Sequence, residues 1–251
     1  MFKEKFGVQL SLILCFYFIL NQVCPVQFNF ISTVYAEQAN QTTNKKDSKL
    51  LDLNKKADSI EAYNKGIDYF NENNYKKAIE EFNKAIQIDP YLLEANSNLG
   101  MTYLKIKKYK DAIKAFNTAL SLDKKHINSI NGLAEAYLKM DEPDKAIETW
   151  NILLKIKPNY AVAFYNLGTA YQQKKDFENA IDYYKKAIGL SPSFAEAYFN
   201  LATIYEKQKD FEEASFMYKK SADVDVKFIY GTTALKKAED LQKKIKKDKK
   251  D

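Results

Sequence analysis

A period of 34 residues constrains this chain more than any other feature of its sequence. From Ser59 onward, five consecutive units align without an insertion. Position 11 is Tyr and position 20 is Ala in every unit, position 24 is always aromatic, and position 8 is always Gly or Ala. The first positions of the units are Ser59, Leu93, Ile127, Ala161 and Ala195. Such a period is typical of repeat architectures, in which each unit is one supersecondary structure.

The spacing inside a unit predicts two helices. Positions 4, 7, 8 and 11 fall on one stripe of a helix, and positions 20, 21, 24, 27 and 28 fall on one stripe of a second. Small residues at positions 8 and 20 let the two helices approach closely, and rings at positions 11 and 24 fill the volume beside that contact. With 7 Gly and 5 Pro in 251 residues, few turns are available. Each pair keeps an apolar face that only a neighbouring pair covers, so the units are expected to stack.

Helix ends are predicted from capping patterns and prolines. Asp58 stands three residues before Glu61, and Ser193 three residues before Glu196, an arrangement that satisfies free N–H groups at the start of a helix. Proline at position 32 is expected to stop the second helix in the units that have it, at Pro90, Pro158 and Pro192.

The pattern resembles the tetratricopeptide-repeat (TPR) family from Ser59 to about Phe228, most closely in residues 161–192. The resemblance implies an all-α fold, a right-handed α-solenoid of five TPR helix–turn–helix repeats with a C-terminal capping helix. The expected organisation is a signal peptide or membrane anchor (1–36), a polar linker (37–58), TPR 1 (59–92), TPR 2 (93–126), TPR 3 (127–160), TPR 4 (161–194), TPR 5 (195–228), and a capping helix with a Lys-rich tail (229–251). The capping helix is expected to bury Leu235, Ala238, Leu241 and Ile245.

The N-terminus predicts export. Lys3 and Lys5 precede an uncharged run over residues 6–36, which is most apolar between Gly7 and Leu20. We expect cleavage after Ala36, which would remove both cysteines of the chain. Two alternatives stay open: residues 6–35 retained as an uncleaved membrane anchor, or a lipoprotein modified at Cys24. The expected location is therefore exported, periplasmic or at the cell surface.

The TPR resemblance implies that the first helix of each pair lines a concave groove that binds a partner. Position 6 faces that groove, and it is Asn in four of the five units and Gly132 in the third. A carboxamide both donates and accepts hydrogen bonds, so a row of them suits an extended peptide backbone; the alternative is that these side chains serve helix packing. We predict that the partner-binding residues are Asn64, Asn98, Asn166, Asn200, Tyr63, Tyr165 and Phe199.

Composition excludes several function classes. All 39 basic residues are Lys, so the bidentate contacts that Arg makes to phosphates and guanine edges are missing, and we expect no nucleic-acid partner. The single histidine, His126, lies in an expected turn without a second metal ligand. We therefore predict no enzyme activity, no catalytic residues, no metal and no cofactor.

The expected function is a non-catalytic scaffold or adaptor of the cell envelope that binds a protein or peptide. A self-associating structural module, anchored to the membrane, is the alternative. The Lys-rich tail of residues 236–251 has two interpretations, a weak contact with anionic surfaces or a solvated end that discourages further stacking.

Overall fold

The computed structural model describes residue 37 and residues 50–225 and 229–248. The chain separates into two compact units, residues 1–58 and residues 59–251. In the first, the described residues are residue 37 and the helical stretch 50–58. The expected signal or anchor (1–36), with the predicted membrane attachment through residues 6–35, lies outside the described residues. Among the helices that are described, none combines the length and apolarity needed to cross a membrane.

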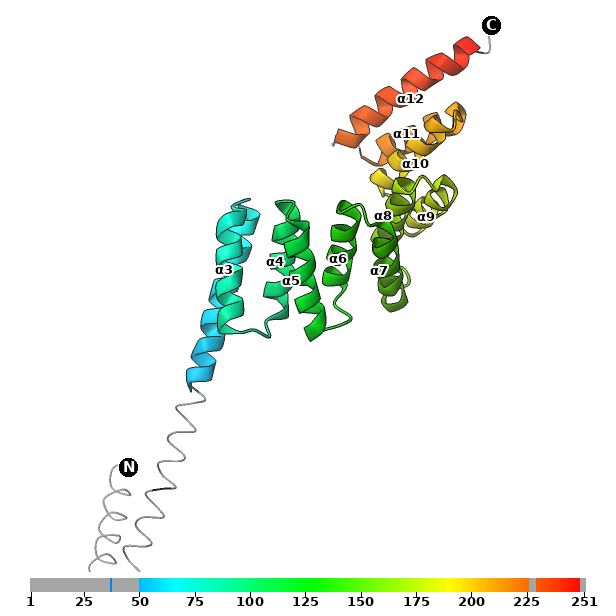
Figure 1. The fold of residues 1–251 in the computed structure, drawn as a ribbon. Helices are drawn as coiled ribbons and strands as arrows, with labels where there is room; N and C mark the ends of the chain where they lie inside the picture. The colour runs from blue at the N-terminus through cyan, green and yellow to red at the C-terminus, as the bar shows by residue number, and fades with distance from the viewer. Residues whose placement is uncertain (1–36, 38–49, 226–228, 249–251) are drawn as a thin grey trace, which may run out of the picture. The chain divides into compact units, whose positions relative to one another are not determined.

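The second unit is built of consecutive helix pairs, which confirms the all-α repeat fold. The pairs follow one another along the chain in Figure 1, and the described residues contain no strand. Residues 59–71 of a helix over residues 50–71 pair with α3 (Tyr75–Ile88). The later pairs are α4 (Leu93–Lys105) with α5 (Tyr109–Leu122), α6 (Ile127–Lys139) with α7 (Pro143–Ile156), α8 (Ala161–Gln173) with α9 (Phe177–Leu190), and α10 (Ala195–Lys207) with α11 (Phe211–Val224).

The core follows the 34-residue register. Alanine at position 20 is fully buried in all five pairs, and the ring at position 24 is buried in each. The small residue at position 8 is a steric requirement: a Cβ added at Gly66 would lie 2.5 Å from Cε1 of Phe82, and one at Gly168 would lie 2.7 Å from Cδ1 of Tyr184. The buried rings are Phe82, Phe116, Trp150, Tyr184 and Tyr218.

Neighbouring pairs stack through their first helices. α4 contacts α6, and α6 contacts α8. Each second helix also packs on the first helix of the next pair, as α3 does on α4 and α5 on α6. The first helices α4, α6 and α8 therefore form one continuous face.

Two predicted helix starts are wrong. Residue 50, inside the expected polar linker, is already helical in the first described helix, so Asp58 is an internal residue of it. Residues 50–58 contain no Gly or Pro to interrupt a helix. The N-cap residue of α10 is Phe194 rather than Ser193, and it makes no side-chain capping bond. Side-chain caps occur instead at the second helices, where Asn74, Asp176 and Asp210 accept from backbone N–H groups three residues on.

The turn inside each pair has one fixed conformation. Position 15 has a positive φ in all five pairs, between 59° and 64°, although none of the five residues is glycine. The residues are Asn73, Lys107, Asp141, Lys175 and Lys209. Left-handed backbone costs a non-glycine residue roughly 1–2 kcal/mol, so packing of the two helices must hold each turn in place.

The helix α12 (Ile229–Asp248) covers the last pair, as the capping prediction requires, and it packs on α10 and α11. Its described buried residues are Gly231, Ala234, Ala238 and Leu241, whereas Leu235, which was expected in the buried stripe, is 48% exposed. The register is therefore one residue from the expected one at this turn, and Ile245 is half-buried.

A polar cluster fixes α12 to the last pair. The Glu206 carboxylate on α10 accepts hydrogen bonds from Tyr218 Oη at 2.7 Å and from Lys237 Nζ at 2.8 Å. Burial alone would raise the pKa of Glu206, but the hydrogen bonds from Lys237 and Tyr218 hold it below its usual range. Burial and the contact with Glu206 raise the pKa of Tyr218.

Candidate functional site

The predicted binding residues lie at positions 5 and 6 of the first helices. Asn98 is on α4, Tyr165 and Asn166 are on α8, and Phe199 and Asn200 are on α10. All five are half-buried. Tyr63 and Asn64 occupy the same positions in the helix over residues 50–71, where Tyr63 is half-buried and Asn64 is exposed.

Three of the four asparagines bond to the residue at position 5 of the preceding repeat. Asn98 Nδ2 donates to Tyr63 Oη at 3.0 Å, Asn166 Nδ2 donates to Asn131 Oδ1 at 3.1 Å, and Asn200 Nδ2 donates to Tyr165 Oη at 3.1 Å. We call these contacts the asparagine ladder. The row is thus partly a structural device that joins neighbouring repeats, the packing alternative that the sequence left open.

Buried rings at position 24 extend the ladder. Trp150 Nε1 donates to Asn131 Oδ1 at 3.0 Å, and Asn200 Nδ2 lies 3.4 Å from Tyr184 Oη. An indole N–H can only donate, so Asn131 must turn its oxygen toward Trp150, and Asn166 must present its NH₂ to the same oxygen. Among the described residues, the Oδ1 atom of Asn166 accepts no hydrogen bond.

The ladder is interrupted once, between the second and third repeats. Position 6 is Gly132 there, and a Cβ at Gly132 would lie 2.3 Å from Cζ of Phe116, whose ring also lies against Gly100. Position 5 of the second repeat is Ser97. The Phe116 ring therefore occupies the space in which an asparagine side chain would start, and the interruption is a consequence of packing.

The aromatic candidates also contribute to the core. The Tyr165 ring lies 4.8 Å from Phe194 and 5.7 Å from Tyr184, and the Phe199 ring meets Tyr218 edge to face at 5.2 Å. Tyr63 lies 6.0 Å from Phe82, and burial raises the pKa of the Tyr63 hydroxyl. These rings keep part of their surface exposed. Each is held by ring contacts within its own repeat, so the three rings are pre-organised.

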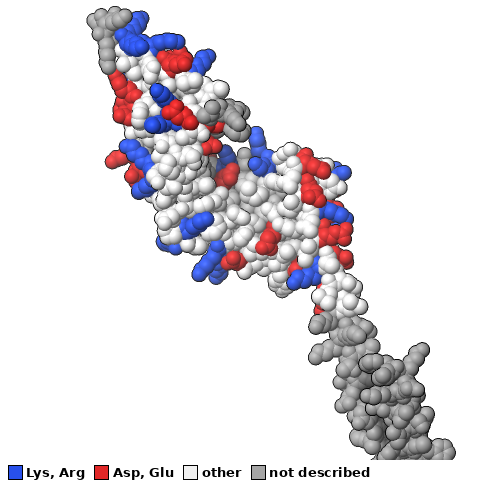
Figure 2. Space-filling view, turned by 180° about the vertical axis from the view of Figure 1, so that it is seen from behind, with Lys and Arg blue, Asp and Glu red and all other residues white. Residues whose placement is uncertain are grey.

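The remaining chemistry is sparse. His126 is the N-cap residue of α6, and its Nδ1 lies 2.8 Å from Ser129 Oγ. No three His, Cys, Asp or Glu side chains among the described residues are grouped to hold a metal ion. On the face seen in Figure 2, lysines and acidic side chains are interspersed. The sequence analysis did not single out Asn131. Its only sequence signal is that it occupies position 5 of the third repeat, one residue before Gly132.

Four family models described as tetratricopeptide repeat match the chain. They cover residues 58–125, 104–168, 161–194 and 183–214, so that residues 58–214 are matched without interruption. No curated protein matches the chain at a significant level.

Solved structures of similar fold include three helical repeat proteins. The crystal structure of MamA is 28% identical and has a TM-score of 0.57, with 64% of this chain and 94% of that chain covered. YrrB, described as "a TPR protein with an unusual peptide-binding site", is 21% identical, with a TM-score of 0.55 and coverage of 75% and 97%. PilW, described as a "widely conserved type IV pilus biogenesis factor", is 17% identical, with a TM-score of 0.64 and coverage of 74% and 91%.

Proposed function

The chain belongs to the tetratricopeptide-repeat family, and from that premise we propose that it is a non-catalytic scaffold or adaptor of the cell envelope, which holds a polypeptide segment along its first helices. The observation that carries the proposal is the asparagine ladder. Repeats of this family generally serve as interaction scaffolds, and a likeness in fold to YrrB, whose description names a peptide-binding site, agrees with a polypeptide ligand. The basic and apolar N-terminus supports the envelope location.

The ladder determines which atom of a carboxamide on the binding face is available to a ligand. At Asn166 the NH₂ group is held by Asn131, so the carboxamide oxygen is the group left for a ligand. A backbone N–H of an extended segment is its natural donor. Partly exposed rings at Tyr63, Tyr165 and Phe199 lie beside the carboxamides and offer apolar contacts to alternate side chains of such a segment.

Asn64 can be replaced without breaking a contact of the asparagine ladder, because it lies in the first repeat and takes part in none of the three contacts. Asn64→Ala should lower capture of the partner from envelope extracts at least fivefold and leave the melting temperature unchanged. Asn151→Ala is the matched control, since Asn151 is exposed on the second helix α7. Equal loss of capture in both variants, or in neither, contradicts the assignment of the binding face.

A self-associating module is the second candidate, and exposed apolar residues of the helical stretch 50–58 favour it. Leu50, Leu51 and Leu53 are each more than half exposed. Apolar surface of this kind is commonly covered by another protein. Sedimentation velocity at several concentrations separates the candidates: a monomer at every concentration excludes self-association, and a concentration-dependent dimer supports it.

A further inference from the structure

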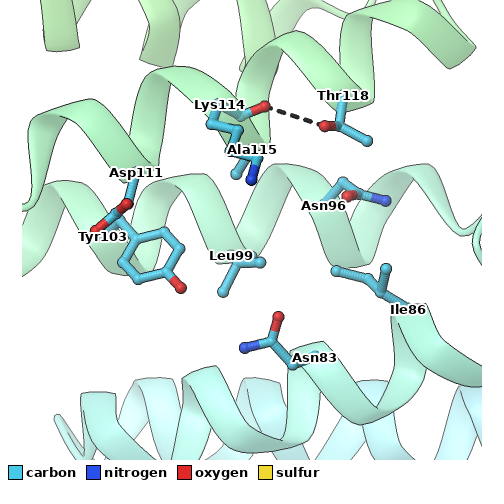
Figure 3. A pocket seen from close by; sticks show the side chains of 9 residues that line it. All are labelled: Asn83, Ile86, Asn96, Leu99, Tyr103, Asp111, Lys114, Ala115 and Thr118. Atoms are coloured by element: carbon cyan, nitrogen blue, oxygen red, sulfur yellow. Dashed lines mark hydrogen bonds between the residues drawn. The ribbon is translucent and has the colours of Figure 1, made fainter.

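A pocket lies between the first two repeats, on the side of α4 that is turned toward α3 and α5. Its volume is about 310 Å³. This is the low end for ligand sites, which span about 300–1,000 Å³, so the pocket suits one side chain. Figure 3 shows Asn83 and Leu99 converging on the space from opposite sides. It is lined by Asn83, Ile86, Asn96, Leu99, Tyr103 and Ala115, with Asp111, Lys114 and Thr118 also at its wall.

The same place in the fourth repeat is filled by the chain itself. Tyr183 occupies position 23 there, and its ring stacks on Tyr171 at 5.2 Å with an interplanar angle of 8°. The Phe164 ring at position 4 also stacks on Tyr183, with the two ring centroids 6.2 Å apart. Tyr171 is at position 11, which is Tyr in every repeat.

The pocket exists because the second repeat has small or polar residues at those two positions. Position 23 is Ala115, and position 4 is Asn96. Tyr103 is the counterpart of Tyr171, and it is half-buried at the pocket wall without a ring stacked on it among the described residues. Leu99 and Ala115 are buried and supply the apolar floor.

The polar groups of the pocket suit a phenol better than a purely apolar ring. The Asn83 carboxamide and the Asp111 carboxylate are at the wall with the Thr118 hydroxyl, and oxygens of these groups accept hydrogen bonds from a hydroxyl. Asn96 is 3% exposed, and its Nδ2 donates to Leu92 O at 3.2 Å, which leaves its Oδ1 without a hydrogen bond from any described residue.

We propose that this pocket receives a tyrosine side chain of a partner polypeptide, whose ring stacks on Tyr103 in the place that Tyr183 fills beside Tyr171. At about 100° per residue, positions 4, 7 and 11 are on the opposite side of the helix from positions 6 and 9. The pocket is therefore a second site, on the side of α4 opposite Asn98. It rests on the proposed function only in that the tyrosine belongs to a protein partner.

The test uses p-cresol, the side-chain analogue of tyrosine, as the probe. Titration into the purified protein should shift the methyl NMR signals of Leu99 and Ile86 in a saturable way. Ala115→Tyr fills the pocket as Tyr183 does in the fourth repeat, and it should weaken p-cresol binding at least tenfold without lowering the melting temperature. Ala115→Ser leaves the space open and should bind within twofold of the parent protein. If Ala115→Tyr does not fold, Asn96→Phe makes the same test from the other wall.

Three outcomes overturn the proposal. The first is the absence of a saturable shift at Leu99, and the second is unchanged binding in both filled variants. The third is dissociation of a dimer by p-cresol, because the occupant would then be a second copy of the chain. None of these measurements involves Asn64, so the pocket and the proposed binding face fail or succeed separately.

Discussion

The asparagine ladder predicts unequal costs for two neighbouring asparagines. Asn166→Ala removes one hydrogen bond, but Asn131 keeps its bond from Trp150. One hydrogen bond contributes about 0.5–1.5 kcal/mol to stability, so Asn166→Ala should lower the free energy of unfolding by about 1 kcal/mol. Asn131→Ala leaves the indole N–H of Trp150 without its acceptor, although Trp150 is only 1% exposed. A buried unsatisfied donor costs about 1–3 kcal/mol in addition, which gives a total of about 2–4 kcal/mol.

Urea unfolding measures both costs, and Trp150 is a natural probe because it is the single tryptophan of the chain. The double variant Asn131→Ala/Asn166→Ala should cost no more than Asn131→Ala alone, because the Asn166 bond is lost already. Asn151→Ala, on the exposed side of α7, should stay within about 0.5 kcal/mol of the parent. A cost for Asn131→Ala that does not exceed the cost of Asn166→Ala would refute this reasoning.

Further expected outcomes concern turns, packing and pH. Lys107→Gly should raise the free energy of unfolding by up to about 1 kcal/mol, because it removes left-handed strain, and the melting temperature should rise with it. Lys219→Gly inside α11 should lower the free energy of unfolding by a similar amount. In thermal melts Gly132→Ala should cost about 1–3 kcal/mol through overpacking, but Gly189→Ala, whose Cβ meets nothing within 4 Å, should be neutral or stabilising. The lowered pKa of Glu206 stabilises the fold above the unfolded pKa of about 4.3, and this contribution is lost as pH falls through the folded pKa. Melting temperatures of Glu206→Gln should therefore lie below those of the parent at pH 6, with the difference shrinking below pH 4.

The fold was predictable because every repeat buries the same pattern of residues. The second helices end at position 30 in every pair, from Ile88 to Val224. Three of the five pairs have a proline two residues later, yet α5 ends at Leu122 without one. The stacking of the next pair therefore ends the second helix at position 30, whether or not a proline follows. The 34-residue period predicts this helix end better than the proline does.

Local signals failed where packing outweighs them. The Asp58–Glu61 pattern looks like a helix start, but the residues before it are also helix formers, and residues 50–58 are helical as well. Leu235 appeared to belong to the buried stripe of α12, yet the small Ala234 faces the core instead and allows a closer approach to α11.

The register of the candidate residues was predictable, and their role in binding stays a prediction. The 34-residue period places Asn98, Asn166 and Asn200 at the same position of the first helices α4, α8 and α10. Their partners are 35 residues away in sequence, so the pairing with Tyr63, Asn131 and Tyr165 depends on how neighbouring repeats stack. The pocket between the first two repeats was missed for the same reason, since it shows only when position 23 is compared between stacked repeats.

Site-specific photo-crosslinking tests the binding face most directly. A benzophenone amino acid replaces exposed Asn64 on the first helix in one protein and exposed Glu148 on the second helix α7 in another. We expect illumination of cells to link the Asn64 position to one polypeptide partner and to leave the Glu148 position unlinked. Crosslinks from Glu148 to the same partner, with none from the Asn64 position, would contradict it.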